Sequence, residues 1–385
     1  MRVADLSRVL AGPYCTMVLA DLGAEVVKVE RPGGGDETRS WGPPFAGGES
    51  AYFLAVNRGK RSVALDLASS EGRDLALELC EGADVVVENF RAGGADRLGL
   101  GYEDVRARNP ETVYCSITGF GLDREPFGRA GYDFVLQAES GLMSITGPPD
   151  GEPHKVGVAL VDVMAGLHAA VAVLAAVHSG RGGRVEVPLL DSALASLVNV
   201  AQGALVTGAE PARHGNAHPS IVPYQDFATA SGRLAVAAPN DGLFRKLCSV
   251  LVRAELAVDP RFATNPDRVA NRAALVVELE AALSARPAAE WVQALSEAGV
   301  PAGEIRSVPA ALEAAAAAGR AATVGVDHPA AGRIELVASP IHMDGMRPAG
   351  PPPLLGQHTA EVLAELGCSP DRVDELVARG VAARA

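Results

Sequence analysis

A long apolar stretch in the middle of the chain constrains the fold more than any other feature of the sequence. Residues 161–178 are almost wholly apolar and rich in alanine, and the glycines of residues 179–183 follow them. A helix that is hydrophobic on every side belongs in a protein core, and a glycine cluster ends it. One carboxylate, Asp162, lies at its start. An aspartate there is either a helix-start cap or a reacting group, and composition alone favours the cap.

The composition argues against a nucleic-acid or membrane partner. The 385 residues carry a formal net charge of −13, whereas nucleic-acid binding needs a concentrated basic face. Residues 161–177 form the apolar run closest to a membrane span, but Asp162 and His168 interrupt it, which favours a core helix. The N-terminus runs into a strand pattern without a signal peptide, and the five cysteines form no CxxC pair. We therefore expect a cytoplasmic protein with reduced thiols.

The first 120 residues alternate strand and helix patterns in the way that is typical of a parallel α/β sheet. Strand patterns at residues 3–6, 24–30, 84–88 and 112–117 are separated by helical patterns. Ligands of open α/β sheets bind beyond the carboxyl ends of the strands, where this chain has loops rich in glycine and arginine. These loops predict a site for an anionic, mononucleotide-type ligand. No GxGxxG follows a strand and no P-loop motif is present, which disfavours NAD-dependent oxidoreductases and P-loop NTPases.

Breaks in the pattern predict how the chain divides into domains. We expect residues 1–200 to begin a large Rossmann-like domain, residues 201–223 to form a linker, and residues 224–300 to form a small α/β domain. Residues 301–385 then return to the large domain. Two histidines in the linker have metal-like spacing, but glycine and asparagine between them are poor helix formers and no glutamate follows the first. We therefore predict no metal site.

Several motifs together resemble the class III CoA-transferases, the CaiB/BaiF family, which also includes formyl-CoA transferases and α-methylacyl-CoA racemases. The Asp162 helix contributes to the match, which runs collinearly from residue 3 almost to the C-terminus. The other motifs are DLSRVLAGP (5–13), LGAEVVKVERPG (22–33), NRGKRSV (57–63), VENF (87–90), GYDF (131–134), GRGG (180–183) and PLLGQHTA (353–360). Each motif is weak by itself, whereas the ordered set is specific.

The resemblance implies a large Rossmann-like domain made from both chain ends, a small inserted α/β domain, and an interlocked homodimer. It places the catalytic nucleophile at Asp162 and implies coenzyme A as a substrate, with no permanently bound cofactor and no metal. The family's CoA contacts fall on Leu10, Ala11, Arg31, Asn89, Phe90, Arg91, Arg97, Ala130 and Tyr132. Lys60 is a weaker candidate for a phosphate contact.

The chemistry that the family performs suits an aspartate. The Asp162 carboxylate attacks the thioester of a donor acyl-CoA, which gives a mixed anhydride and free CoA thiolate. Acyl groups are then exchanged on that side chain with a small carboxylic acid. Because the nucleophile is itself a carboxylate, the forward and reverse steps are nearly symmetric in energy. A helix N-terminus near Asp162 is expected to keep the carboxylate ionised.

Two departures from the family's patterns select among its branches. Racemases pair the aspartate with a proton-shuttling histidine, and Tyr132 occupies that position here, which favours acyl transfer. Formyl-CoA:oxalate enzymes carry consecutive glycines in the linker, where this chain has Gly215, Asn216 and His218. They also use polar side chains at the positions of Leu10 and Ala11. We therefore expect a larger or less polar acyl group than oxalate, such as succinyl or another dicarboxylic acid.

The substrate pocket is predicted to include Trp41 and Tyr132, together with Gly215, Asn216 and His218 of the linker. A core position is an equal alternative for Trp41, and simple solvation is the alternative for His218. Two other functions stay open from sequence. The chain could be a 2-methylacyl-CoA racemase of the same fold, or a non-catalytic CoA-binding protein in which Asp162 is structural.

Overall fold

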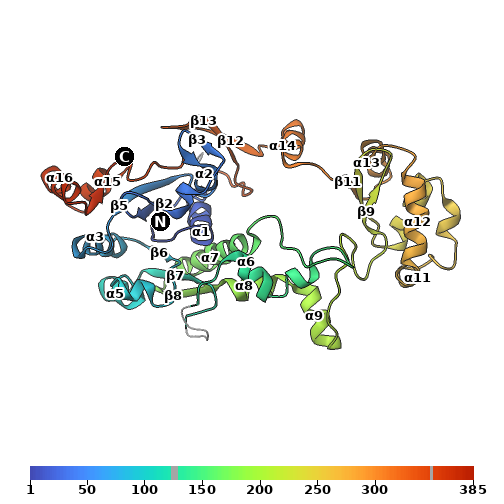
Figure 1. Cartoon of the computed structure of the whole chain (residues 1–385), viewed down its shortest axis with the longest axis horizontal. Coiled ribbons are helices and arrows are strands. Elements are labelled where there is room, and N and C mark those ends of the chain that lie inside the picture. Colours follow the sequence, from blue (N-terminus) through green and yellow to red (C-terminus); the bar gives the residue numbers. More distant parts are fainter. Residues whose placement is uncertain (123–128, 347–349) are drawn as a thin grey trace. The chain divides into compact units, whose positions relative to one another are not determined.

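The computed structural model describes residues 1–122, 129–346 and 350–385, and it divides into two compact units (Figure 1). Unit 1 contains residues 1–143, 155–209 and 319–385, so both ends of the chain belong to it. Unit 2 contains residues 144–154 and 210–318. The chain therefore changes unit four times, at residues 143–144, 154–155, 209–210 and 318–319, and the third of these changes lies inside the predicted linker.

Unit 1 is built on a seven-stranded sheet in which six neighbouring strands run parallel. The last strand of the chain pairs antiparallel with β5 at one edge. In spatial order the strands are β14 (Ala382–Ala383), β5 (Lys60–Leu65), β2 (Glu25–Glu30), β1 (Arg2–Asp5), β6 (Val85–Glu88), β7 (Val113–Thr118) and β8 (Gly183–Pro188). The predicted α/β class is thus confirmed by a large, mostly parallel sheet.

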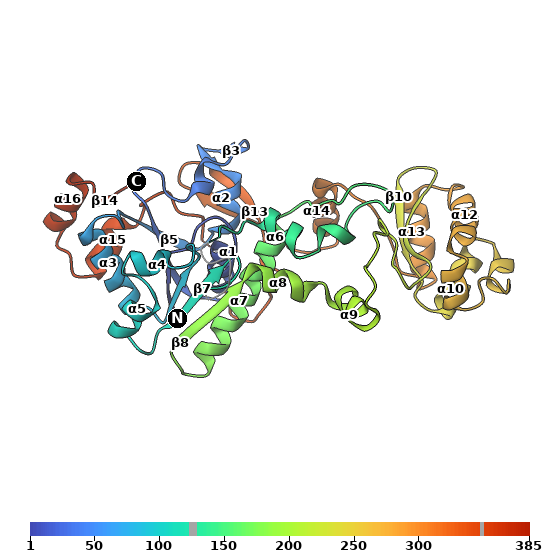
Figure 2. The same ribbon diagram turned by 60° about the horizontal axis from the view of Figure 1, so that its bottom comes forward.

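Alternate side chains of each strand support a helical layer on each face of the sheet (Figures 1 and 2). Val3, Val113 and Cys115 face one layer, whereas Ala4 and Tyr114 face the other. The first layer contains α1 (Ala11–Asp21), α7 (Leu160–His178) and α8 (Leu189–Ser196). The second contains α3 (Ser70–Glu81), α5 (Tyr102–Arg108), α15 (Thr359–Glu365) and α16 (Pro370–Ala378). Strands buried on both faces explain the nearly continuous valine runs of the sequence.

The apolar stretch that the sequence places in the core forms α7, a helix of 19 residues. Its length and composition would also allow it to cross a membrane. In the structure it packs on α1, β7 and β8, and Ala165, Ala169 and Val173 are fully buried. Its other side exposes apolar residues, including Val171 at 67%. The helix is therefore buried on one side and exposed on the other, and it is not enclosed by the part of the chain that the structure describes.

Unit 1 contains further elements outside this sheet and its two helical layers. They include α2 (Ala51–Val56), α4 (Gly94–Arg97), α6 (Asp133–Glu139), α9 (Val198–Thr207), the hairpin β3 (Phe45–Ala46) and β4 (Glu49–Ser50), and the hairpin β12 (Thr323–His328) and β13 (Gly332–Val337).

Unit 2 has a core of its own around a three-stranded antiparallel sheet. A hairpin forms β9 (Tyr224–Ala228) and β10 (Arg233–Ala237), and β11 (Ala302–Glu304) pairs with β10. Its helices are α10 (Asp241–Val250), α11 (Asn265–Ala270), α12 (Arg272–Leu283), α13 (Ala288–Glu297) and α14 (Val308–Ala317). Within this unit, the Arg213 guanidinium donates to three carbonyl oxygens of residues 144–151, which joins its two chain segments.

The packing of α7 against α1 depends on Gly166. A Cβ atom added there would lie 2.6 Å from the carbonyl oxygen of Ala11 and 3.3 Å from the backbone nitrogen of Cys15. These are backbone atoms of a neighbouring helix and cannot move aside without shifting α1. Glycine at this position therefore allows the two helices to approach closely.

We expect Gly166→Ala to destabilise the protein by about 1–3 kcal/mol because it overpacks this contact. A glycine-to-alanine change inside an open helix usually has the opposite sign and stabilises by about 1 kcal/mol. Chemical denaturation followed by circular dichroism measures the difference. An increase in the free energy of unfolding would contradict the close packing of α7 on α1.

Candidate active site

A pocket opens at the carboxyl ends of four neighbouring parallel strands of unit 1. The loops after β1, β6, β7 and β8 all contribute to its wall, together with the segment that precedes α6 and the start of α7. This is the edge of an open α/β sheet where ligands bind. Asp162 lines this pocket. The structure thus brings the predicted nucleophile and the predicted strand-end loops together.

Most of the predicted CoA contacts lie in this one pocket, although they are separated in sequence. Its lining includes Leu10, Ala11, Asn89, Phe90, Arg91, Ala130 and Tyr132. Leu10 and Ala11 are buried and form an apolar wall, whereas the Tyr132 side chain is 52% exposed at the rim. The lining also contains Thr118, Gly119 and Gly121, where the glycines leave the backbone free to approach a ligand.

Two arginines that the sequence analysis did not single out also line the pocket. Arg8 lies 5.5 Å from the centre of the Phe90 ring and pairs with Glu37 at 3.1 Å. Arg129 lies 4.7 Å from the centre of the Phe120 ring. With Arg91 they place three guanidinium groups at the pocket, the kind of donor that suits a phosphorylated ligand, while Glu37 pairs with Arg8 and Glu139 pairs with Arg129. The sequence signal that could have identified them is their position, since Arg8 follows β1 closely and Arg129 comes shortly before the GYDF motif.

Three predicted CoA contacts lie elsewhere in the structure. The Lys60 side chain is fully buried, and its ammonium group donates to Asp5, Asn57 and the carbonyl of Pro13 at 2.8–3.1 Å. With every donor engaged inside the protein, Lys60 has no free face for a phosphate, so the structure gives its prediction no support. Arg31 and Arg97 are exposed on the surface and are not among the residues that line the pocket.

The predicted substrate residues divide between the two units. Trp41 is 37% exposed and packs edge-on against Tyr52, with ring centres 5.2 Å apart. Burial, with a contribution from Asp162, raises the pKa of Tyr52 to about 12. Neither Trp41 nor Tyr52 is among the described residues that line the Asp162 pocket. Gly215, Asn216 and His218 lie in unit 2, where Asn216 donates to Asp226 and the His218 ring packs against Tyr224.

Asp162 is the third residue of α7 and is 8% exposed. Among residues 1–122, 129–346 and 350–385, none donates a hydrogen bond to its carboxylate. Burial, followed by the nearby Asp133 carboxylate, raises the pKa of Asp162 to about 7. This direction is opposite to the expectation that a helix N-terminus near Asp162 would help to keep the carboxylate ionised.

The reason lies in how the start of α7 is capped. The residue before the helix, Ala159, has no side chain that could cap it. Instead Asp133, the first residue of α6, accepts the backbone N–H of Val161 at 2.8 Å and the side-chain amide of Gln137 at 2.7 Å. Asp133 thus takes the position that suits a carboxylate at a helix start. Asp162 is left buried, close to a second carboxylate and without a hydrogen-bond donor from the part of the chain that the structure describes.

Comparison with known proteins assigns this α/β protein, with its buried carboxylate at a strand-end pocket, to a family. The sequence model of CoA-transferase family III matches residues 1–359. The succinyl-CoA:glutarate CoA-transferase of Mus musculus is 43% identical over 388 residues, covering 99% of this chain and 89% of its own. The acetyl-CoA:oxalate CoA-transferase of Acetobacter aceti is 42% identical and covers 80% of each chain.

A solved structure agrees with these sequence matches. The crystal structure of a CAIB/BAIF family protein from Brucella suis is 42% identical, with a TM-score of 0.85 over 95% of this chain and 98% of that one. The chain belongs to CoA-transferase family III. The resemblance seen in the sequence and the assignment to the CoA-transferases are therefore confirmed.

The unusual pKa of Asp162 predicts how stability depends on pH. In the unfolded chain the carboxyl loses its proton near pH 4, whereas in the folded chain it holds the proton to about pH 7. Wild-type stability therefore falls as pH rises through this window. Asp162→Asn removes the buried charge and should be more stable than wild type above pH 7, by up to about 4 kcal/mol.

Thermal unfolding of both proteins from pH 4 to pH 8 measures this difference, which should shrink towards pH 4. Asp226→Asn is a control of opposite sign. Although partial burial raises the pKa of Asp226, hydrogen bonds from Arg233 and Asn216 hold it below its usual value. This variant should therefore lose stability at neutral pH. An Asp162→Asn protein that is no more stable than wild type at pH 8 would contradict the buried charge.

Proposed function

We propose that the protein transfers coenzyme A between an acyl-CoA and a carboxylic acid through a mixed anhydride on Asp162. One observation carries this proposal. Asp162, at the start of α7, is nearly buried and has no hydrogen-bond donor among the described residues. It lines the same pocket as most of the predicted CoA contacts. A carboxylate with few hydrogen bonds and little water around it is a stronger nucleophile than a solvated one.

The proposed reaction consists of four successive acyl transfers, and each one forms one acyl bond and breaks another. The Asp162 carboxylate attacks the thioester carbonyl of the donor, the C–S bond breaks, and CoA thiolate leaves. The thiolate attacks the Asp162 carbonyl of the mixed anhydride, which releases the donor acid and leaves an aspartyl-CoA thioester. The acceptor carboxylate then displaces the thiolate to form a second anhydride. Attack of the thiolate on the acceptor's carbonyl yields the new acyl-CoA and restores Asp162.

The pocket supports a preference among substrates. Leu10 and Ala11 present buried apolar surface beside Asp162, and three arginines surround the opening. We propose succinyl-CoA or a similar acyl-CoA as donor and a short dicarboxylic acid as acceptor, as the name of the mouse relative indicates for that enzyme. The relative from Acetobacter aceti is named for oxalate. Oxalate therefore belongs in the same substrate panel as glutarate.

A racemase is the alternative function of the same fold. It requires a second proton-transferring group opposite the aspartate, and the residue at the expected position, Tyr132, is half exposed at the rim. None of the described residues that line the pocket is a histidine. Exchange of the α-proton of a 2-methylacyl-CoA in deuterated water, without an acceptor acid, would favour the racemase.

Trapping of the acyl-enzyme tests the transferase proposal directly. Wild-type protein incubated with succinyl-CoA and then hydroxylamine should carry a hydroxamate on the peptide that contains Asp162, detected by mass spectrometry. Asp162→Ala should carry none and should lose at least about 10³-fold in kcat, because the covalent route is removed.

New acyl-CoA products with glutarate or oxalate identify the acceptor. Full activity of Asp162→Ala would overturn the proposal, and CoA binding without either reaction would leave a non-catalytic CoA-binding protein.

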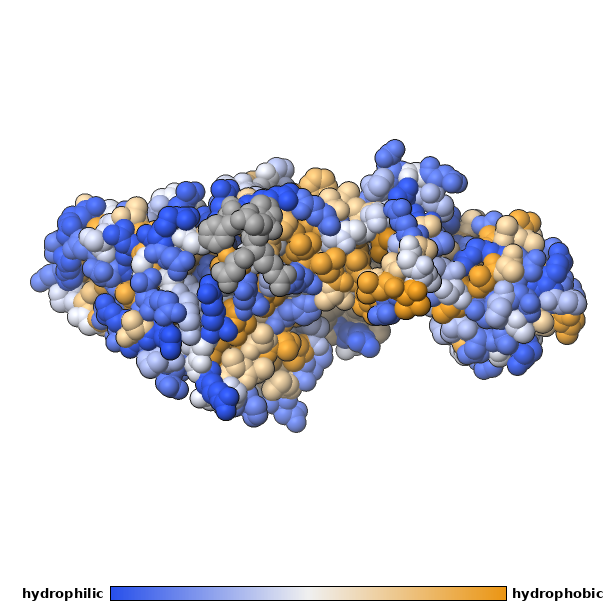
Figure 3. Space-filling view, turned by 90° about the horizontal axis from the view of Figure 1, so that it is seen from below, coloured by the Kyte–Doolittle hydropathy of each residue, from blue (hydrophilic) through white to orange (hydrophobic). Residues whose placement is uncertain are grey.

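We also propose that two copies of the chain associate as an interlocked homodimer, with both chain ends forming the Rossmann-like domain of each copy. The support is exposed apolar surface in unit 1, on the free side of α7 (Leu167, 40%; Val171, 67%) and on α9 (Leu205, 79%; Val206, 75%). Apolar surface is also visible on the face drawn in Figure 3. Exposed apolar patches mark interaction sites. A second copy that covers these helices would shield their apolar side chains from water. We therefore propose that the dimeric enzyme is cytoplasmic.

Sedimentation velocity at micromolar protein concentration should give a single dimeric species. Val171→Glu combined with Leu205→Glu places charges in the proposed interface and should produce monomers with reduced transferase activity. Val258→Glu, at another exposed apolar residue (78% exposed) in unit 2 and outside these helices, is the matched control and should remain dimeric. A wild-type protein that sediments as a monomer would contradict this proposal.

A further inference from the structure

The turn between β1 and α1 has a strained backbone at the wall of the Asp162 pocket. Val9 has a φ of 69°, in the left-handed region. This conformation is a rare outlier for a β-branched residue and costs on the order of 1–3 kcal/mol. The next residues, Leu10 and Ala11, are buried in the pocket lining. Val9 and Asp162 also line the same pocket, so the strain lies in the wall of the pocket that holds the predicted nucleophile.

Asn89 holds the residue before Val9. Its side-chain oxygen accepts the backbone N–H of Arg8 at 2.8 Å, and its side-chain nitrogen donates to the Arg8 carbonyl at 2.6 Å. Both polar atoms of the amide are thus used to join the end of β6 to this turn. The family resemblance implies that Asn89 contacts CoA, and the structure gives its side chain a bridging role within the protein.

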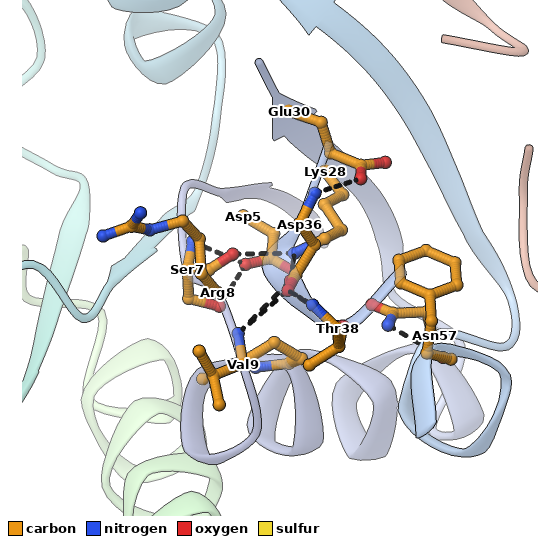
Figure 4. Close-up of polar contacts among 12 residues, drawn as sticks. Asp5, Ser7, Arg8, Val9, Lys28, Glu30, Asp36, Thr38 and Asn57 are labelled. Atoms are coloured by element: carbon orange, nitrogen blue, oxygen red, sulfur yellow. Dashed lines mark hydrogen bonds and ion pairs between the residues drawn. The ribbon is translucent and has the colours of Figure 1, made fainter. Parts of the chain in front are cut away.

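Asp36 holds Val9 itself (Figure 4). The backbone N–H of Val9 is shared between the two carboxylate oxygens of Asp36, at 3.2 and 3.3 Å. The same carboxylate accepts the backbone N–H of Thr38 at 3.0 Å and its hydroxyl at 2.9 Å. Its orientation is therefore fixed by its own chain segment, independently of the turn that it holds.

A fully buried ion pair joins Asp36 to the other side of the same turn. Lys28 lies 3.0 Å from Asp36, neither side chain is exposed, and the Lys28 ammonium also donates to the Ser7 carbonyl at 2.7 Å. Burial alone would raise the pKa of Asp36, but Lys28 and Thr38 outweigh it and hold that pKa below its usual value. A charge-assisted contact of this kind is stronger than a neutral one. The pair therefore holds the turn at both Ser7 and Val9.

The turn is followed directly by the N-terminus of α1, which lines the pocket. That helix has no side-chain cap, and no acceptor for the N–H groups of Leu10 and Ala11 is present among the described residues. On the other helix, Gly166 lies one turn after Asp162 on the same face and contacts the Ala11 carbonyl. The position of α1 relative to Asp162 thus depends on the two residues that follow Val9.

We propose that Asp36 is a positioning residue for the CoA-transferase reaction: with Lys28 it holds Val9 in the left-handed conformation and so fixes Leu10 and Ala11 against Asp162. This inference rests on the proposed function. Without Asp36, Val9 relaxes to a negative φ and the residues after it move. A displacement of about 1 Å beside a reacting group can cost about 10²-fold in rate.

The first test is Asp36→Asn, which keeps the size of the side chain and removes the charge. The kcat should fall about 10- to 100-fold because the reacting geometry is lost. The KM for the acyl-CoA should change by a smaller factor than kcat, since Arg91 and Arg129 line the pocket from other loops that this substitution does not touch. The rate of hydroxamate formation at Asp162 should fall in parallel with kcat.

The second test uses the strain itself. Glycine adopts the left-handed conformation without cost, so Val9→Gly no longer needs Asp36 to hold it. Val9→Gly should remain active, and the double variant Asp36→Asn/Val9→Gly should recover at least about 5-fold in kcat over Asp36→Asn, which corresponds to about 1 kcal/mol of relieved strain. A purely structural role for Asp36 gives no such rescue, because added glycine further loosens the fold.

Asp21→Asn is the matched control. Asp21 is also buried in an ion pair, with Arg58, but it lies at the opposite end of α1. This variant should lower the melting temperature and leave kcat unchanged. If Asp36→Asn does not fold, Thr38→Val removes one support of the same carboxylate and should give a smaller loss of kcat, again reduced by Val9→Gly.

The results separate this inference from the proposed function. Wild-type protein that forms no acyl-enzyme and transfers no CoA overturns the proposed function. Wild-type protein that is active while folded Asp36→Asn keeps kcat within 2-fold overturns the positioning role only. A loss of kcat in Asp36→Asn that Val9→Gly does not restore also overturns it.

Discussion

The close contact of α7 with α1 is the constraint on which the rest of the structure depends. Gly166 lets the backbones of the two helices approach, and the small alanines around it continue the contact. Close-packed interiors leave no room to compensate for a shift of one helix. Because α1 follows β1 directly and α7 precedes β8, this contact also fixes the strand-end loops relative to Asp162. The geometry of the pocket therefore depends on a contact that carries no chemistry itself.

Electrostatics at this contact are divided between two aspartates. Asp133 takes the hydrogen bonds that the start of α7 offers, and Asp162 is left with none from the described residues. A well-bonded carboxylate stabilises the fold, whereas an unpaired one is reactive and destabilising. The same division appears at the β1–α1 turn. There the buried Lys28–Asp36 pair has a partner for each charge and holds a strained backbone beside the pocket.

Much of this arrangement was predictable because local patterns and a collinear resemblance agree. The strands at residues 85–88 and 113–118, and their alternation with helices, follow directly from periodicity. The break between two helices and the partners of a buried lysine could not be predicted from the sequence. The largely apolar residues 189–207 form two helices, α8 and α9, because the chain breaks at Val198, which has a φ of 38°. Lys60 looked like a phosphate ligand in a basic run, but its charge is satisfied inside the core by Asp5.

The sequence by itself determined the α/β class, the core helix and the family, because periodicity, composition and ordered motifs are local properties of the chain. Only the tertiary structure decided the electrostatic state of Asp162 and the roles of Asp36 and Asn89. Those properties depend on distances between residues that are 27 to 81 positions apart in sequence. Burial and capping are set by whichever groups the fold brings together, and no spacing along the chain encodes them.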